Sequence, residues 1–388
     1  MSYYSKQYDG IKAFMIARVS DPSQREALPA QKYKLSEIEE QLISNLSKTF
    51  SDNEDIFSSL TDSDIDFGVI HDENNKEVTL TNTNYSIYVK SSNRRVRQNA
   101  FLQLYKTYER YKTTLSKLLE GEVKQTATFN KIRGYKSSLE AAMYHDELDT
   151  RVYNSLIESV SNGFKPLFKY FNLKKKILGI NEMHVYDTYA DIIPSYNKEY
   201  SFEDAKKLIK ETLKVFGEDY LKNIDKAFDE HWIDIMPNIG KRGGAYSGGC
   251  YDTKPYILTN FQGEFNDVST LIHELGHSMH SYYSRNNNRY ECSGYSIVVA
   301  EVASTVNELL LAKHVLKTSS DNTEKLYILD RLISLFKGTI YRQTMYEEFE
   351  KFIFETVEKE ESLNSDVLAN KFYDLNKKYY GDGIVLDD

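Results

Sequence analysis

The stretch FNDVSTLIHELGHSMHSYY, residues 265–283, contains the pattern His-Glu-x-x-His at His273, Glu274 and His277. If it is helical, four residues turn the chain by about 400°, so His273 and His277 lie on one face, about 6 Å apart along the axis. Two imidazoles placed in this way can converge on one zinc ion. Glu274 lies about 100° around the helix, where it can flank the ion as a water-activating carboxylate without binding the ion itself.

A zinc ion that takes part in chemistry needs a third protein ligand and one position open to water. The next carboxylate on a suitable element is Glu301, in the segment YSIVVAEVASTVNELLLAKH at residues 295–314. A polar, turn-prone stretch separates this predicted helix from the first one, which permits an antiparallel return. Glu301 and Glu308 share one face, so we expect Glu301 to reach the metal and Glu308 to orient an imidazole from the outer shell.

The remaining histidines are not expected to bind this ion. His280 is three residues after His277, but it lies seven residues from His273, a rise of about 10.5 Å that is too large for one ion to hold both. A packing or hydrogen-bonding role next to the site is predicted for it instead. Five other histidines are scattered and are expected to be ordinary polar or core residues: His71, His145, His184, His231 and His314.

Charge and cysteine content exclude several classes of function. Lys and Arg total 49 and Asp and Glu total 58, a formal net charge of −9, so no nucleic-acid partner is expected. The two cysteines, Cys250 and Cys292, are too few for a disulfide framework, and they fit a reduced, cytoplasmic protein. The N-terminal stretch MSYYSKQYDGIKAFMIARVSD has no sustained apolar run, so we expect neither a secretory signal nor a membrane partner.

Helical periodicity dominates the chain and predicts a mainly α fold. Apolar residues at Leu35, Ile38, Leu42 and Leu46 predict one helix, and a longer stripe over residues 101–119 predicts another. The first two hundred residues are therefore typical of a helical bundle. We predict a boundary that separates an N-terminal helical domain, residues 1–165, from a domain over residues 166–388 that carries the histidine motif.

Two short hairpins are expected among the helices. The first, over residues 66–80, is predicted to turn at Glu73 to Asn75 and to be structural. The second, GAYSGGCYDTKPYILTNF at residues 244–261, alternates apolar and small residues and contains Pro255, which is normally confined to sheet edges. An exposed, glycine-rich edge strand beside the motif helix would bind an extended peptide by main-chain pairing. Together with a metal-activated water, it indicates peptide-bond hydrolysis.

Five segments of the sequence resemble the oligoendopeptidase F branch of the thimet oligopeptidase family. The likeness runs from about Thr79 to Gly383. The segments are RGYKSSLEAA (133–142), KRGGAYSGGCYDTKPYIL (241–258), HELGHSMHSYYSR (273–285), VAEVASTVNE (299–308) and YRQTMYEEFE (341–350).

The resemblance implies a mainly helical, gluzincin-like zinc-peptidase fold, with a small hairpin and edge strand beside the active-site helix. It implies a zinc endopeptidase that admits short oligopeptides to a deep channel and excludes folded proteins. One zinc ion per chain would be held by His273, His277 and Glu301, and Glu274 would be the general base and acid. The strand at Gly244, Ala245 and Tyr246 would line the substrate channel, and residues 166–388 would be the catalytic domain.

The sequence resembles a family member trimmed at both ends. In the family, a helical stretch that carries a histidine and substrate-binding tyrosines follows the YYGDG segment, whereas this sequence stops at Asp388. An alternative function therefore stays open at this point, that of a zinc-stabilised, catalytically impaired helical protein that binds peptides without cutting them. A purely structural helical scaffold is a third possibility, but it leaves the histidine and glutamate pattern unexplained.

Overall fold

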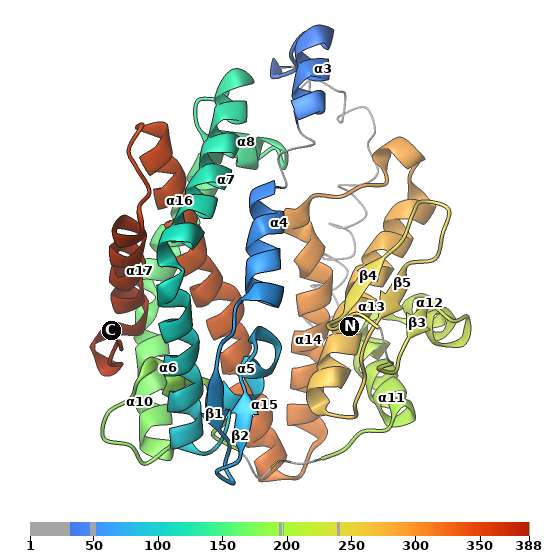
Figure 1. Ribbon diagram of the computed structural model, residues 1–388. Coiled ribbons are helices and arrows are strands. Elements are labelled where there is room, and N and C mark those ends of the chain that lie inside the picture. The colour runs from blue at the N-terminus through green and yellow to red at the C-terminus, as the bar shows by residue number, and fades with distance from the viewer. Residues whose placement is uncertain (1–31, 47–51, 194–195, 197, 239–240, 388) are drawn as a thin grey trace. The chain divides into compact units, whose positions relative to one another are not determined.

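The computed structural model describes residues 32–46, 52–193, 196, 198–238 and 241–387 (Figure 1). Contacts within the chain divide it into two compact units. The first unit contains the described part of residues 195–332, and the second contains the described parts of residues 29–194 and 333–388. No helix in these ranges is both long enough and apolar enough to cross a membrane. The N-terminal stretch for which the sequence predicts no secretory signal lies outside the described residues.

The second unit is mainly helical, as the periodicity predicts. Its hairpin is also confirmed, since β1 and β2 pair antiparallel with Ile70 opposite Val78. The elements of this unit are α3 (Glu37–Leu46), α4 (Asp52–Ser59), β1 (Val69–His71), β2 (Glu77–Thr79), α5 (Asn82–Val89), α6 (Arg94–Arg110), α7 (Lys112–Ile132), α8 (Ser138–Tyr144), α9 (Thr150–Asn162), α10 (Phe164–Ile177), α16 (Gln343–Glu358) and α17 (Ser365–Tyr380).

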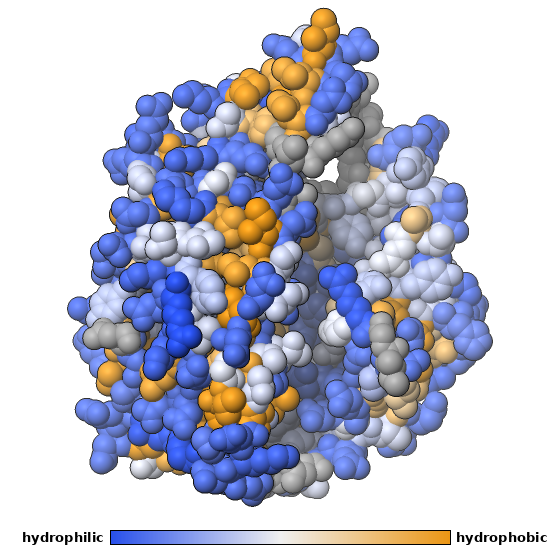
Figure 2. Space-filling model, in the orientation of Figure 1, coloured by the Kyte–Doolittle hydropathy of each residue, from blue (hydrophilic) through white to orange (hydrophobic). Residues whose placement is uncertain are grey.

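Two of the predicted helices differ in detail from the structure. The stripe over residues 101–119 belongs to two helices instead of one, because α6 ends at Arg110 and α7 begins at Lys112. Helix α3 forms where predicted, but its Ile38 and Leu42 are 83% and 59% exposed. Figure 2 shows apolar side chains gathered over α3 and α4 on the surface. The apolar spacing of α3 therefore predicts the helix correctly, although that helix buries none of its residues.

The first unit combines a small sheet with a helical layer. Strand β4 pairs antiparallel with β5, and β5 pairs parallel with β3, so the order is β3-β5-β4 and β4 lies at an edge. The second predicted hairpin is thereby confirmed, with an additional strand. The elements are α11 (Phe202–Leu213), α12 (Glu218–Asp229), β3 (Ile233–Asp234), β4 (Tyr246–Gly248), β5 (Tyr256–Leu258), α13 (Phe265–Asn287), α14 (Ile297–Thr318) and α15 (Asn322–Phe336), which continues into the second unit.

Helix α13 is fixed in this unit by one fully apolar face. Val268, Leu271, Ile272, Leu275 and Met279 recur at intervals of one, three and four residues, and each is at most 1% exposed. They pack in a core with apolar residues of α11, α12 and α14. Burial of side chains of this size stabilises the fold by about 1.5–3 kcal/mol each. The opposite face of the helix is left free to carry polar groups.

The boundary predicted at residue 165 falls inside α10 of the second unit. The second unit is discontinuous along the chain, since residues from before and after the first unit contribute to it. The division into an N-terminal helical domain, residues 1–165, and a catalytic domain, residues 166–388, stays a prediction.

Candidate functional site

Helices α13 and α14 lie side by side and antiparallel (Figure 1). They approach closely at Gly276, where an added Cβ would lie 2.6 Å from Cα of Ser304 and 2.7 Å from the carbonyl oxygen of Ala303. The buried Asn307 adds a hydrogen bond from its amide to the carbonyl of Ile272, at 3.1 Å. The glycine inside the His-Glu-x-x-His pattern is therefore needed for this backbone contact.

The close contact brings the predicted metal-binding group together. Nε2 of His273 lies 3.2 Å from Nε2 of His277, and the two carboxylate oxygens of Glu301 lie 3.4 and 3.5 Å from these nitrogens. Ligand atoms that are about 2.0–2.1 Å from a tetrahedral metal ion are separated from one another by about 3.3 Å. The three side chains fit such an ion, and they are the group of potential metal ligands that the described residues contain.

The two imidazoles have different electrostatic surroundings. Burial lowers the pKa of His277 below its ordinary value, although the Glu301 carboxylate opposes this shift. Burial acts on His273 in the same direction, but the hydrogen bond to Glu308 and the nearby carboxylate charges together outweigh it and raise the pKa of His273. Once the Nδ1 of His273 donates to Glu308, its Nε2 presents a lone pair towards the other ligands.

Glu308, the residue predicted to orient an imidazole, contacts His273. Its Oε2 lies 3.0 Å from Nδ1 of His273, and its Oε1 accepts a hydrogen bond from the Ser269 hydroxyl at 3.1 Å. The Ser304 hydroxyl plays a similar part for Glu301, since it donates to Oε2 at 2.7 Å. Ser269 and Ser304 could not be recognised from the sequence as partners of the carboxylates, because a serine on a helix gives no signal of its own.

Replacement of Glu308 by glutamine is expected to weaken metal binding about 10- to 100-fold. The amide keeps the shape of the side chain but removes the charge that makes the His273 imidazole a better ligand. Competition with a coloured chelator measures the affinity. Glu291→Gln, which removes an exposed carboxylate outside the site, is the control and is expected to leave the affinity unchanged. Equal affinities for both variants would contradict the role of Glu308.

Glu274 lies beside the metal-binding group and is buried, with 7% of its surface exposed. Burial raises its pKa, and the His273 imidazole and the backbone of Ser247 oppose this rise. The contact with Ser247 links the carboxylate to strand β4. A buried carboxylate with a raised pKa can accept a proton and later release it, which is the behaviour of a general base and acid.

Strand β4 is attached to α13, and no strand in the described part of the chain pairs with its other edge. The hydroxyls of Ser247 and Ser278 lie 2.8 Å apart and join the strand to the helix. Asn260 donates hydrogen bonds to the carbonyls of Arg242 and Gly244, at 3.0 and 2.9 Å. Asn260 therefore holds the segment that leads into β4, a role that the sequence analysis did not find.

The residues predicted to line a substrate channel are accessible. Gly244 and Tyr246 are exposed, and Ala245 is partly exposed. Gly244 has φ +82°, a conformation that an L-amino acid rarely adopts. They directly precede Ser247, whose backbone contacts Glu274.

His280 packs beside the group of potential metal ligands and is not part of it. Its ring stacks on Tyr295 at a centroid distance of 3.8 Å, and its Nδ1 is buried without a hydrogen-bond partner among the described residues. Burial lowers the pKa of His280 to about 4. Tyr295 also lies within hydrogen-bonding distance of Ser281, with 2.8 Å between the hydroxyls, so this cluster ties the end of the α13–α14 connection to α13.

Acidification is expected to destabilise the metal-free protein through His280. Its pKa is lower in the folded chain than in the unfolded chain, so its contribution is complete above about pH 6.5 and is lost as the pH falls towards 4. The loss is about 2 kcal/mol at about pH 5. We expect His280→Phe, which keeps an aromatic ring against Tyr295, to show a smaller fall of Tm from about pH 7.5 to about pH 5. Equal falls for both proteins, measured with chelator present, would contradict this expectation.

The other histidines lie outside the metal-binding group. His184, in the second unit, pairs with Asp387 at 2.7 Å. Within the described residues, His71, His145, His231 and His314 do not belong to a group that could hold a metal ion. The expectation that these are ordinary residues is consistent with these positions.

Comparisons with known proteins agree with the resemblance of the sequence to oligoendopeptidase F. The family described as peptidase family M3 matches residues 87–388, and the family described as oligopeptidase F matches residues 22–67. Oligopeptidase PepF of Bacillus subtilis (strain 168) is 41% identical over 353 residues, which cover 91% of this chain and 53% of that protein. An oligoendopeptidase F homolog of Lactococcus lactis subsp. lactis (strain IL1403) is 39% identical over 348 residues, which cover 89% of this chain and 57% of that protein.

Comparison of the fold with solved structures agrees with these family matches. The crystal structure of oligoendopeptidase-F from Enterococcus faecium superposes with a TM-score of 0.71 at 30% sequence identity, over 91% of this chain and 57% of that chain. The chain spans about half the length of the curated relatives it matches. The predicted mainly α peptidase fold is confirmed. Since the M3 family matches well over half of the sequence, this chain belongs to peptidase family M3, a family of metallopeptidases, in its oligoendopeptidase F branch.

Proposed function

We propose that this chain is a zinc-dependent endopeptidase that hydrolyses short oligopeptides. The observation that carries the proposal is the convergence of His273, His277 and Glu301 beside the buried carboxylate of Glu274. Two imidazoles and one carboxylate are a typical ligand set for a zinc ion that keeps a position open to water. The Glu301 side chain is 57% exposed, so the group is accessible from solvent.

In the proposed reaction, the residues of the chain orient the ion and move protons. Zinc, when bound by His273, His277 and Glu301, supplies Lewis acidity towards the scissile carbonyl and makes the attacking water more acidic. Glu274 takes a proton from that water as it attacks the carbonyl carbon. The same carboxylic acid then protonates the leaving amine as the peptide bond breaks, which returns Glu274 to its starting state.

We propose that the substrate lies along the open edge of β4. Main-chain hydrogen bonds to an edge strand hold a peptide in the extended form and are independent of its side chains. The exposed Tyr246 then contacts the peptide, and the bare backbone of Gly244 allows close approach. Short peptides are the proposed partners, and a cytoplasmic location agrees with the two free cysteines.

Metal content and peptide cleavage test the proposal together. The purified chain, never exposed to chelator, is expected to contain roughly one zinc per chain by elemental analysis. It is also expected to cleave short quenched fluorescent peptides and to lose this activity with chelator. A chain that lacks zinc contradicts the proposal, and a zinc-loaded chain that binds peptides without cutting them supports the alternative of an impaired binding protein.

A further inference from the structure

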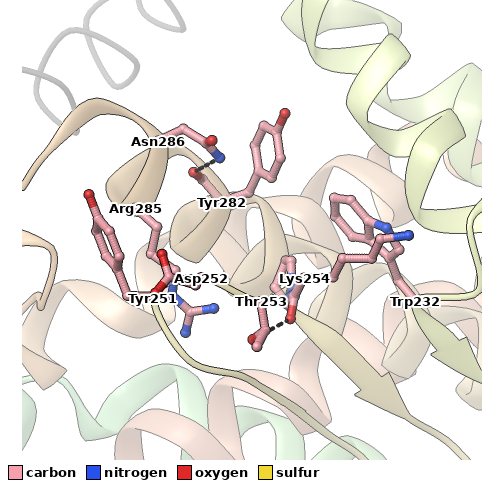
Figure 3. Close-up of a pocket in the computed structure, with 9 residues that line it drawn as sticks. Trp232, Tyr251, Asp252, Thr253, Lys254, Tyr282, Arg285 and Asn286 are labelled. Atoms are coloured by element: carbon pink, nitrogen blue, oxygen red, sulfur yellow. Dashed lines mark hydrogen bonds between the residues drawn. The ribbon is translucent and has the colours of Figure 1, made fainter. Parts of the chain in front are cut away.

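A pocket of about 450 Å³ lies in the first unit, between the loop that joins β4 to β5 and the last turns of α13 (Figure 3). Three aromatic side chains contribute to its walls, Trp232, Tyr251 and Tyr282, and the rings of Trp232 and Tyr282 lie 5.6 Å apart. Two cationic side chains, Lys254 and Arg285, also line it. The pocket therefore combines flat apolar surfaces with positive charge.

The charge of Arg285 is not neutralised by another described residue. Its Nη2 donates to the carbonyl of Gly249 at 2.8 Å, whereas its Nη1 is buried and has no hydrogen-bond partner in the described part of the chain. A buried donor without a partner costs about 1–3 kcal/mol, and more when the group is charged. Lys254 differs, because it pairs with the Glu230 carboxylate at 3.1 Å. Arg285 is thus the cation of this pocket that lacks a counter-ion among the described ranges.

The guanidinium is suited to one class of ligand. A planar fork of N–H donors matches the two oxygens of a carboxylate, and a charge-assisted hydrogen bond of this kind is about twice as strong as a neutral one. The exposed Asp252 also lines the pocket, but the described residues contain no ion pair between it and Arg285. An incoming carboxylate would pair with the Arg285 guanidinium where it lines the pocket and place its neighbouring side chain against the aromatic walls.

The pocket is linked to the proposed substrate strand. Gly249, which Arg285 holds, directly follows the last residue of β4, and Ser247 of the same strand contacts Glu274. Two extended residues span about 7 Å. A peptide that follows β4 therefore reaches the pocket within a few residues of the proposed general base.

We propose that this pocket binds a carboxylate of a peptide, either its C-terminus or an acidic side chain, through Arg285. The identity of the ligand as a peptide rests on the proposed function. The preference for a carboxylate comes from the Arg285 guanidinium, and it can be measured without any cleavage.

The pocket contains its own reporter, because Trp232 is the only tryptophan of the chain. Three probes are titrated while tryptophan emission is followed: N-acetyl-phenylalanine, its amide, and N-acetyl-glutamyl-phenylalaninamide. We expect the free acid to bind about tenfold more tightly than the amide, since it gains a charge-assisted bond. Tight binding of the third probe instead would assign the preference to an acidic side chain. Equal, weak binding of all three probes would overturn the proposal.

Variants separate recognition from a merely structural role of Arg285. Arg285→Gln is expected to lower the affinity for the acid about tenfold, to the level of the amide, and to leave the affinity for the amide unchanged. Arg289→Gln, with the same charge change outside the pocket lining, is expected to keep the preference. A preference that persists in Arg285→Gln would overturn the proposal. If that variant does not fold, the comparison of probes on the unmodified chain decides, and zinc content and cleavage remain separate tests of the proposed function.

Discussion

Replacement of Glu274 by glutamine is expected to lower peptide turnover by about 10²- to 10⁴-fold while the metal content stays the same. The amide cannot accept a proton from the attacking water, but its oxygen still accepts a hydrogen bond from the backbone of Ser247. The proposed metal ligands are other side chains, so their geometry is unaffected. Steady-state cleavage of a fluorescent peptide and elemental analysis on the same preparation measure both effects.

The control for this variant is Glu291→Gln, which removes an exposed carboxylate away from the site. It is expected to retain the activity of the unmodified chain. If Glu274→Gln cleaved peptides at an undiminished rate with its metal bound, Glu274 would not be the general base. If it lost its metal instead, Glu274 would have a part in holding the ion.

Replacement of Gly276 by alanine is expected to destabilise the protein by about 1–3 kcal/mol and to weaken metal binding at least tenfold. The added methyl group would lie 2.6 Å from the backbone of Ser304, so the two helices must separate. Since Glu301 is one turn from Ser304, the separation moves this carboxylate away from His273. Thermal unfolding without metal and a competition titration with zinc measure the two effects.

Gly294→Ala is the matched control for this change. Gly294 lies in the connection between the helices, and an added Cβ there has no neighbour within 4 Å. We expect it to leave both metal affinity and stability nearly unchanged. Normal metal binding in Gly276→Ala would show that the site does not depend on close helix contact.

The metal-binding group could be predicted from the sequence because helical geometry relates spacing to direction. The interval between His273 and His277 places both imidazoles on one face, and the larger interval to His280 excludes it from the same ion. The structure brings the first two together with Glu301 and leaves His280 stacked on Tyr295. The directions of these side chains follow from the period of the α-helix, so residue spacing alone is enough to predict them.

The partners of these residues could not be predicted, because they depend on how separate elements pack. The contact between Ser247 and Glu274 exists because β4 lies against α13, and no spacing along the chain specifies that distance. Strand β3 was missed because two residues are too short for any pattern. The feature of Arg285 could not be predicted either. Its Nη1 is buried without a partner among the described residues because of how the loop after β4 packs, and the sequence does not specify that packing.

The antiparallel pair of helices also bears on how the protein folds. His273, His277, Glu301 and the supporting Glu308 all come from one uninterrupted hairpin of α13 and α14. Contacts that are close in sequence form faster than distant ones, because a shorter loop has to close. A nascent chain that has been synthesised as far as Thr318 already contains all four of these side chains, whereas the second unit must wait for its last segment. The candidate metal-binding group can therefore assemble before the discontinuous unit is complete.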